Sequence, residues 1–599
     1  MIYYVSQNSG APGDGTQAHP FRQIQPAAEL AMPGDTVIIG DGVYREWVNP
    51  KHGGLGNNQR ITYIAEEGAH PVISGAEIVS HWQRKTGSVW YTVVDNSLFG
   101  KYHSFADEVF GDWYDGLGQV HHTGELFLDG DALYESASYE ALCRDPEPSM
   151  GGYRWFAQVR DTDTVLYGNF GPVDPNAHVT EISVRPYCFF PEKEGISYIT
   201  VSGLTLCCAA TQWAPPTAFQ PGLIGPHWSK GWIIENCRIH DSKCCGISLG
   251  KRAEQQDNAW TKYHRKGGTQ IYTELIFANL SKDWDRETVG SHIVRGNEIY
   301  NCGQAGIVGC MGGAFSEITG NHIHHVNIRH EFSGAEMAGI KLHAAVDAVI
   351  AKNVIHDCIR GIWLDWEAQG TAVRKNAFFR NEEEDVFIEV SHGPCTVENN
   401  LLMSGRGFLN MSQGTAFVHN LVTGKLYPAP DTNRFTLYHL PHSTMVGGVM
   451  LVYGGDDRMI NNIFVKKEIP DAHYGTFGTA CYDGYAAPDD PSAMDHDLPS
   501  ADAGRTLPVF IHDNVYLEGG QPCAFEENPR LSDIPVQIAI TEQDGGYWLE
   551  TNLYQAPVDF TAARVTTEVL GAAFESGQPY ENRDGSPLSV DSDFTDAPS

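Results

Sequence analysis

A short motif centred on asparagine recurs along the 599-residue chain, and no other feature restricts the possible folds as strongly. In each copy an Asn is followed by a hydrophobic pair, a turn and a short stretch of mostly apolar residues that contains Gly. The copies begin at Asn236, Asn297, Asn321, Asn353, Asn376, Asn400 and Asn420, and two more follow at Asn462 and Asn514. From Asn297 to Asn420 the spacings are 24, 32, 23, 24 and 20 residues. Self-similarity at such a period indicates a repeat architecture.

Each repeat holds about three short strands, too few to bury a hydrophobic face alone, so successive repeats must stack. The period and the β-branched strands favour an all-β fold, a right-handed parallel β-helix. Asn fits its corners because it tolerates left-handed backbone, and stacked Asn side chains can hydrogen-bond from rung to rung. A leucine-rich repeat has a similar period, but its LxxLxLxxN signature is missing.

Four segments are predicted along the chain. Residues 1–80 form an N-terminal cap and the first rungs, and a helix from Phe21 to Ala31 closes the open end of the solenoid. Residues 81–195 carry strands at hairpin spacing, which indicates an inserted β-sandwich. Residues 196–530 form the main β-helix with the active site. Residues 531–599 are acidic and read as loosely attached strands with a frayed, solvated tail.

The charge of the chain restricts its partners. Forty Lys and Arg against 75 Asp and Glu give a formal net charge of −35. A surface this acidic repels phosphate backbones and anionic lipid, so neither nucleic acid nor a membrane is an expected partner. It also disfavours polyuronate substrates, which need clustered basic residues. Neutral sugars fit better.

The cysteine pattern and the N-terminus bear on location and cofactors. No stretch approaches the roughly 20 apolar residues of a membrane span, and no basic and then apolar N-terminal segment marks a secretory signal. Thirteen Cys is an odd number, which favours reduced, buried thiols in a cytoplasmic protein. No CxxC…CxxC or HExxH spacing occurs, so neither a metal site nor a cofactor is expected.

Four strands align by the apolar residue that follows their first position: GIVGC (306–310), GIKLH (339–343), GIWLD (361–365) and DVFIE (385–389). Because strand side chains alternate between faces, the second and fourth positions point inward. One outward column then holds Cys310, His343, Asp365 and Glu389. A second outward column holds Val308, Lys341, Trp363 and Phe387.

Asp365 and Glu389 are the candidate catalytic pair. Each precedes the next repeat Asn by eleven residues, so their registers agree. Adjacent strands lie about 4.7–4.9 Å apart. Retaining glycosidases hold their two carboxyl groups about 5–5.5 Å apart, whereas inverting enzymes leave about 6.5–9.5 Å. Stacked like charges also raise one pKa, as a general acid requires. The alternative is that both acids are solvated surface.

The neighbours of this pair are candidate substrate-binding residues. His343 could orient a sugar hydroxyl or a carboxylate, and Lys341 could neutralise the acids. Trp363 supplies apolar surface that would strengthen the pKa shift. Trp113 and Trp213 are candidate sugar platforms, although the sequence favours core packing for both.

Around these columns the sequence resembles the β-xylosidases of glycoside hydrolase family 120. The matching blocks are Glu108–Trp113, TQWAPPTAFQPGLIGPHWSKGWIIE (211–235), AGIKLHAA (338–345), GIWLDWEAQGT (361–371), DVFIEVSHGP (385–394), NMSQG (410–414) and YHLPHST (438–444). The resemblance runs from the N-terminal cap to about residue 520. It implies a right-handed β-helix interrupted by a β-sandwich, and retaining removal of single xylose units from short xylo-oligosaccharides.

The resemblance also implies individual roles. Asp365 corresponds to the nucleophile and Glu389 to the acid/base, a distinction that the spacing alone does not make. Glu336 corresponds to a contact with the nonreducing-end sugar, and Trp113 to an aromatic contact. In the family the residue before that Glu can be His, whereas here it is Ala335, which leaves strict xylose selectivity open. A homodimer or homotetramer is implied, in which a neighbouring sandwich domain helps to close the pocket.

The hypothesis is therefore a retaining exo-β-xylosidase acting on xylobiose and short xylo-oligosaccharides in xylan degradation. One alternative is another pentosidase on the same scaffold, such as an α-L-arabinofuranosidase. A second is a polysaccharide lyase, which needs a basic proton abstractor and usually Ca²⁺. A third is a solenoid that binds carbohydrate without turnover.

Overall fold

The computed structural model describes residues 1–10, 13–144, 152–264, 266–467, 474–489, 506–555 and 562–597. It consists of two compact units, and each is described by itself. The first comprises Met1–Leu275, Arg295–Gly312 and His325–Met337, and the second comprises Ile276–Val294, Gly313–His324 and Ala338–Ser599. The helices are short: α1 Gln25–Leu30, α2 Tyr139–Leu142, α3 Ala259–Tyr263, α4 Gly268–Leu280 and α5 Thr567–Leu570. Among the described residues, none of the helices has both the length and the apolar character needed to cross a bilayer.

The first unit opens with a cap and the early rungs of a solenoid. One parallel sheet holds β1 (Ile2–Val5), β2 (Thr36–Ile39), β4 (Ile61–Ala65), β16 (Ile199–Ser202) and β18 (Ile233–Glu235). A second holds β3 (Val43–Tyr44), β5 (Val72–Ser74), β17 (Thr205–Cys207), β19 (Arg238–Ser242) and β22 (Glu298–Cys302). Helix α1 lies within the predicted capping helix and buries Ala27 and Ala28, because apolar residues at helical spacing share one face.

Two sheets interrupt the rungs of this unit, and their strands pair antiparallel except for β12 and β13, which run parallel. One has the order β11-β10-β15-β6, with bounds Asp131–Ala132, Leu126–Leu128, Thr180–Ser183 and Ala76–Val79. The other has the order β12-β13-β14-β8-β7, with bounds Tyr134–Glu135, Arg154–Val159, Asp163–Asn169, Val89–Asp95 and Gln83–Thr86. A core that includes Trp82, Phe105, Trp155 and Phe170 packs between their strands. The predicted sandwich is present. Its predicted limits stay predictions, and β6 already pairs within it at Ala76.

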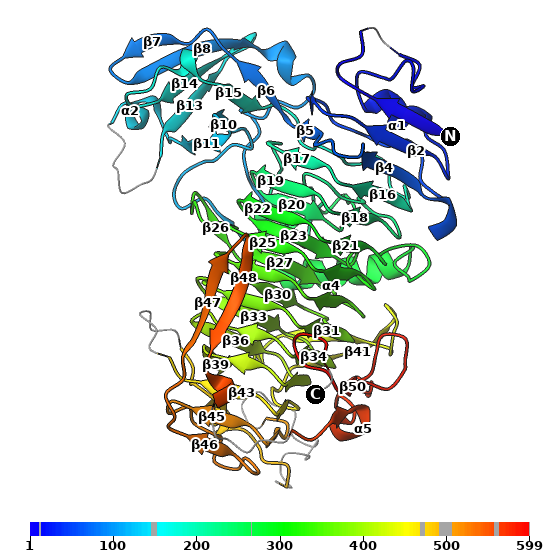
Figure 1. Ribbon diagram of the computed structural model, residues 1–599, viewed down its shortest axis with the longest axis vertical. Coiled ribbons are helices and arrows are strands. Elements are labelled where there is room, and N and C mark those ends of the chain that lie inside the picture. Colours follow the sequence, from blue (N-terminus) through cyan, green and yellow to red (C-terminus); the bar gives the residue numbers. More distant parts are fainter. Residues whose placement is uncertain are drawn as a thin grey trace. The chain divides into compact units, whose positions relative to one another are not determined.

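The second unit is a parallel β-helix of three sheets. The first sheet runs β24-β28-β31-β34-β37-β42-β44, with bounds Glu317–Thr319, Val349–Ala351, Thr371–Arg374, Cys395–Glu398, Thr415–Val418, Arg458–Ile460 and Phe510–His512. The second runs β25-β29-β32-β35-β38-β43-β45-β46, with bounds His322–His324, Val354–His356, Ala377–Phe379, Leu401–Leu402, Leu421–Val422, Ile463–Val465, Val515–Leu517 and Arg530–Ser532. The third runs β27-β30-β33-β36-β39, with bounds Ala338–His343, Ile362–Asp365, Glu384–Glu389, Arg406–Met411 and Lys425–Pro428. These strands lie in successive layers (Figure 1), which confirms the predicted all-β solenoid.

The repeat asparagines form a continuous ladder through the second unit. In Asn321, Asn353, Asn376, Asn400, Asn420 and Asn462, the backbone N–H donates to Oδ1 of the next Asn at 2.9 Å. Each side-chain amide donates to the same oxygen at 2.9–3.0 Å. This is the predicted rung-to-rung stacking.

The physical reason given for Asn at the corner needs correction. The left-handed residue is the one before the ladder Asn, for example Lys352 at φ 57° and Lys375 at φ 55°. Asn236 itself has φ 54°, and the ladder position in its rung belongs to Cys237, whose N–H donates to Asn297. Asn is required because its side-chain amide both donates and accepts hydrogen bonds, and not because it tolerates a left-handed backbone.

Part of the C-terminal segment packs on the β-helix, where loosely attached, solvated residues were expected. Strands β49 (Val565–Thr566) and β50 (Ser589–Val590) pair with each other. Their apolar residues form a buried cluster with the β-helix, made of Ala416, Val418, Ile460, Val565, Leu570, Tyr580, Leu588 and Val590. The acidic composition of this segment indicated that water would surround it. The apolar residues between its acids nevertheless bury enough surface to attach it to the β-helix.

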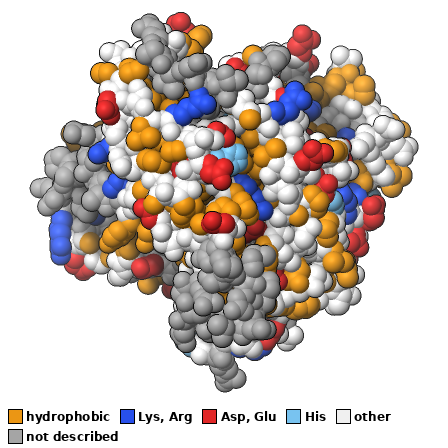
Figure 2. All heavy atoms as spheres, turned by 90° about the horizontal axis from the view of Figure 1, so that it is seen from below, with side chains coloured by type: hydrophobic (Ala, Val, Ile, Leu, Met, Phe, Trp, Pro, Cys, Tyr) orange, Lys and Arg blue, Asp and Glu red, His pale blue; other side chains and the backbone are white. Residues whose placement is uncertain are grey.

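The acidic residues are dispersed over the visible surface. On the face drawn in Figure 2, acidic side chains stand among apolar and uncharged ones.

All 13 Cys are free thiols and 11 of them are buried, as the cysteine pattern predicted.

Candidate active site

The two candidate acids lie side by side in the third sheet of the second unit. Asp365 ends β30 and Glu389 ends β33, and the two residues are register partners in a parallel pair. The register follows from the apolar residues on the opposite face, since Ile362 and Val386 are also partners and both are fully buried. The strand alternation predicted from sequence therefore brings the two carboxylates onto adjacent rungs.

A lysine and a histidine hold Asp365. Lys341 Nζ donates to Asp365 Oδ2 at 2.5 Å, and His343 Nε2 lies 3.2 Å from the same oxygen. Burial raises the pKa of the Asp365 carboxyl, but the charges of His343 and Lys341 outweigh it, so the net pKa lies below the usual value. The other oxygen, Oδ1, is buried and has no hydrogen-bond partner among the described residues. Asp365 is thus kept ionised, with one oxygen uncommitted.

Glu389 has the opposite environment. Its Oε2 accepts a hydrogen bond from Trp363 Nε1 at 3.1 Å, and its Oε1 is paired with the Arg434 guanidinium. Burial and the neighbouring charge of Asp365 raise the pKa of the Glu389 carboxyl to about 7, although Arg434 and Lys341 act in the other direction. Near neutral pH this carboxyl can therefore both give up and accept a proton.

Aromatic rings enclose the charged groups. Trp363 stacks on Phe387 with ring centroids 4.8 Å apart and planes 25° apart. The Lys341 ammonium lies 3.1 Å from the centre of the Trp363 ring. Asp365 is only 5% exposed, which contradicts the alternative that it is plain solvated surface. These residues point away from the solenoid core, but later parts of the chain cover them.

Arg434 is a site residue that sequence reasoning missed. It precedes β40 (Phe435–His439), which pairs with β41 (Val446–Leu451) in an antiparallel hairpin between β39 and β42. Its guanidinium also bonds Asp431 at 2.6 Å and lies 5.5 Å from the centre of the Trp366 ring. The hairpin lies outside the repeat, so no register argument could place it. The YHLPHST block was its only signal.

A third buried carboxylate lies two residues beyond Asp365. Glu367 is 2% exposed, and its Oε2 lies 3.5 Å from Nε2 of His439 on the same hairpin. Burial raises the pKa of the Glu367 carboxyl, while His439 and His343 lower it. Sequence reasoning also missed this pair, because Glu367 follows the strand and does not belong to the aligned column.

The backbone is unusual where the two strands end. Trp366 and Glu367 follow Asp365 with φ of 39° and 65°, and Val390 follows Glu389 with φ of 45°. A β-branched residue at positive φ is strained, and such strain is often found at functional sites. Here the sharp corners end the strands directly after the two acids.

The remaining predicted residues belong to the first unit. Trp113 is half-buried, has φ 61° and packs against Trp260, with ring centroids 5.6 Å apart. Trp213 is buried and donates from Nε1 to the carbonyl of Asp112 at 2.9 Å, so it serves as core. Glu336 is also buried. The second unit itself brings together Lys341, His343, Trp363, Asp365 and Glu389.

The geometry suits one class of chemistry in particular. Two neighbouring carboxyl groups whose pKa values are driven apart can act as an ionised nucleophile and a protonated acid. A lyase needs a free basic group as proton abstractor, but the Lys341 ammonium is committed to Asp365 and the Trp363 ring.

Comparison with known protein families identifies two parts of the chain. The model of the glycoside hydrolase 120 insertion domain matches residues 79–182. The model of the right-handed β-helix region matches residues 283–423, in agreement with the predicted handedness.

Among solved structures, XylC in complex with xylose is 42% identical in sequence to this chain. The alignment covers 100% of this chain and 97% of the XylC chain, and the TM-score is 0.94. A glycoside hydrolase family 136 lacto-N-biosidase from Eubacterium ramulus is 15% identical with a TM-score of 0.37, too low to support an inference. An uncharacterized protein, YwoF of Bacillus subtilis (strain 168), is 38% identical over 77 residues, which are 13% of this chain and 16% of that protein.

Proposed function

Because this chain belongs to glycoside hydrolase family 120, we propose that it is a retaining exo-β-xylosidase that releases xylose from the nonreducing end of short xylo-oligosaccharides. The observation that carries the proposal is the pair of neighbouring carboxyl groups with divided pKa values. That of Asp365 is lowered and that of Glu389 is raised to about 7. A retaining glycosidase needs one ionised and one protonated carboxyl group on adjacent positions of this kind.

In the first step Asp365 Oδ1 attacks the anomeric carbon of the terminal sugar. The bond from that carbon to the glycosidic oxygen breaks, and the oxygen takes the proton of Glu389 as it leaves. Lys341 and His343 engage only Oδ2. They therefore orient the carboxylate, while Oδ1 has no hydrogen-bond partner among the described residues and is available to the sugar.

In the second step a water molecule gives a proton to Glu389. The oxygen of that water attacks the anomeric carbon and displaces Asp365. Two inversions leave the released xylose with its original β configuration. Glu389 is prepared for this reversal because the charge of Asp365 helps to raise its pKa. Once Asp365 is esterified that charge is gone, the pKa of Glu389 falls, and the residue becomes a base.

Three supports underlie the choice of substrate and assembly. XylC, which aligns over nearly the full length of both chains, was solved with xylose. The acidic surface favours neutral sugars over uronates. Family membership supports a homodimer or homotetramer whose neighbouring sandwich domain completes the pocket, and light scattering would measure its mass.

The free thiols support a cytoplasmic location.

The Glu389→Ala variant tests the proposed roles. We expect turnover of xylobiose to fall about 10²–10⁴-fold, because the leaving sugar is no longer protonated. Turnover of an aryl xyloside with a good leaving group should fall less, because that group leaves without being protonated. Azide should restore part of this turnover by attacking the glycosyl-enzyme. Proton NMR of the first product from xylobiose by the wild-type enzyme should show β-xylose.

Glu382→Ala is a matched control, since Glu382 is exposed just before the same strand. It should keep wild-type rates on both substrates. Full turnover by the Glu389 variant, or α-xylose as the first product, would overturn the mechanism. A higher initial rate on nitrophenyl α-L-arabinofuranoside than on the xyloside would instead favour the other pentosidase, the possibility that Ala335 leaves open.

A further inference from the structure

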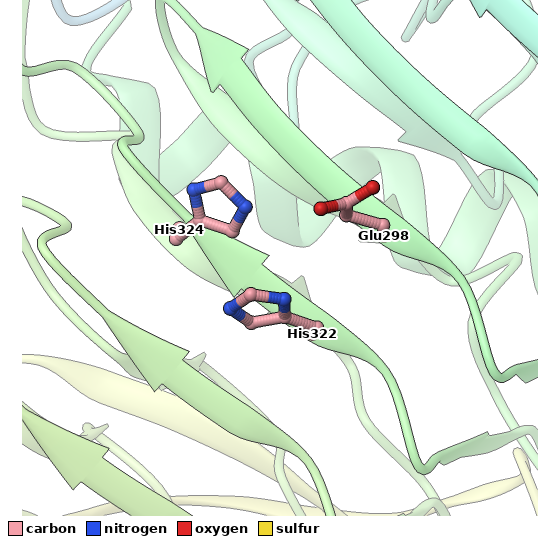
Figure 3. Close-up of side chains that lie close together, drawn as sticks. All are labelled: Glu298, His322 and His324. Atoms are coloured by element: carbon pink, nitrogen blue, oxygen red, sulfur yellow. The ribbon is translucent and has the colours of Figure 1, made fainter. Parts of the chain in front are cut away.

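Three histidines gather on the second sheet of the second unit, away from the sheet that carries the two acids. His322 and His324 alternate with the buried Ile323 on β25, so both imidazoles project from the same outward face. Figure 3 shows the two rings side by side on that strand. His356 on β29 is the register partner of His324. A His-x-His strand with a third histidine on the neighbouring strand thus presents three imidazoles to one region.

His322 lies close to both of the other histidines. Nε2 of His322 and Nε2 of His356 lie 2.8 Å apart. The rings of His322 and His324 have centroids 4.4 Å apart, and a nitrogen of each lies within 4.8 Å of the other. Zn–N bonds are about 2.0–2.1 Å long, so nitrogens that share one ion lie roughly 3 Å apart. The rings of His324 and His356 are parallel, with centroids 5.3 Å apart, so one of them must change rotamer to bring all three nitrogens to that spacing.

A carboxylate fixes the orientation of the most buried ring. His356 Nδ1 lies 2.6 Å from Asp357 Oδ2, and Arg380 Nε holds the other oxygen of Asp357 at 2.8 Å. An N–H donated from Nδ1 to a carboxylate leaves the lone pair on Nε2, which faces His322. Metal-binding histidines characteristically donate their second nitrogen to a carboxylate in this way.

Aromatic stacking alone explains only part of this arrangement. His356 stacks on Phe379 at 4.6 Å and 13°, and it contacts Tyr547 of β48 (Gly546–Thr551) edge to face at 4.9 Å. A stacked ladder requires parallel rings, which His324 and His356 also have. It does not require two Nε2 atoms to meet, nor a carboxylate behind one ring.

We propose that His322, His324 and His356 bind a divalent transition-metal ion of the zinc class. Imidazole is the ligand that zinc, copper, nickel and iron share, and three histidines with an open fourth position form a common zinc site. No metal-binding spacing along the chain marks this set. This set is assembled by register between two rungs. It is independent of the proposed glycosidase activity, because no residue of the acid pair takes part.

Zinc uptake by the untagged full-length chain tests the proposal. After treatment with chelator, isothermal titration with Zn²⁺ should give one saturable site per chain, and zinc should raise the unfolding temperature. Co²⁺ should give a visible spectrum of nitrogen coordination without a thiolate band. The His322→Gln/His324→Gln double variant should lose this site. Asp357→Asn, which removes only the carboxylate behind His356, should weaken binding about 10–100-fold.

His512→Gln is the matched control. His512 Nδ1 also pairs with the next residue, Asp513, at 2.8 Å, within the similar segment Ile511–Asn514. This variant should bind zinc as the wild type does. Circular dichroism and xylosidase activity report whether each variant is folded. If the folded double variant takes up zinc with unchanged affinity, or if the wild type binds less than one ion per chain, the proposal is wrong.

Discussion

Asp365 and Glu389 occupy equivalent positions on adjacent strands, yet their pKa values move in opposite directions. The reason lies in which cations reach each group. Lys341 and His343 both contact Asp365, whereas Glu389 has Arg434 and the indole N–H of Trp363 and also faces the charge of Asp365. At the scale of single residues, the groups around each carboxyl therefore set its pKa, and in the proposed mechanism this difference separates the nucleophile from the proton donor.

The Arg434→Met variant tests this electrostatic balance. The Arg434 charge lowers the pKa of Glu389, so its removal should raise that pKa further above 7. Because Glu389 must be protonated to act as the acid, activity is lost as the pH rises through its pKa. The alkaline limb of the kcat/KM profile should therefore move to higher pH, by about one unit or more.

Arg374→Met provides the comparison for this experiment. Arg374 lies on a different sheet and faces Glu398, so its loss should leave the limb in place. If Arg434→Met left the alkaline limb unchanged or moved it to lower pH, the guanidinium would not control the protonation of Glu389. The profile should be recorded with xylobiose, whose leaving sugar depends on proton transfer.

At the scale of the element, the asparagine ladder holds one rung to the next. Asn400 accepts from the backbone and side-chain N–H groups of Asn376 at 2.9 and 3.0 Å. It donates to the carbonyl of Val373 and to Asn420 at 2.9 and 3.0 Å. All these groups are buried, so the ladder satisfies main-chain groups at a corner where sheet pairing stops.

Replacing Asn400 by Ala should therefore cost about 3 kcal/mol of unfolding free energy, because several buried donors and acceptors lose their partner. Chemical denaturation followed by intrinsic fluorescence measures the loss as a lower midpoint. The exposed Asn433 serves as the control, and Asn433→Ala should unfold at the wild-type midpoint. Equal midpoints for the two variants would show that the ladder contributes nothing.

At the scale of the whole molecule, segments outside the repeat build on the second unit's β-helix. The hairpin β40–β41 supplies His439 and follows directly on Arg434. The C-terminal segment contacts this hairpin, since Glu581 lies 3.1 Å from His442. Its Gln578 also accepts a hydrogen bond from Gln369, just before β31, at 2.7 Å. The regular rungs thus provide a scaffold on which the irregular segments pack, and Arg434, just before the hairpin, reaches Glu389.

Tyr580→Ala tests whether the C-terminal segment stabilises the fold. Tyr580 is fully buried in the cluster with the β-helix, and its hydroxyl accepts a hydrogen bond from Arg458 at 2.9 Å. Truncation of a buried aromatic side chain should cost about 3–5 kcal/mol. The unfolding temperature should fall and proteolysis of the C-terminal segment should speed up. Tyr554→Ala, at a residue 86% exposed, should do neither.

The sequence predicted the features that repeat. Regular spacing of the Asn residues gave the solenoid, and the alternation along GIWLD and DVFIE gave the register of the acid pair. It did not predict Arg434, the Glu367–His439 pair or the packing of Tyr580. These depend on contacts between segments far apart in the chain, which no periodic pattern encodes.

Strand alternation and the stacking of identical rungs are local rules, so the amino-acid order by itself determined the β-helix, the inserted sandwich and the placement of two carboxyl groups on adjacent rungs. Only the tertiary structure decided how those groups differ. The pKa of a buried carboxyl depends on desolvation and on every charge within a few ångströms, and one of those charges, Arg434, lies next to a hairpin outside the repeat. The same holds for the three histidines, which become neighbours only after two rungs are stacked.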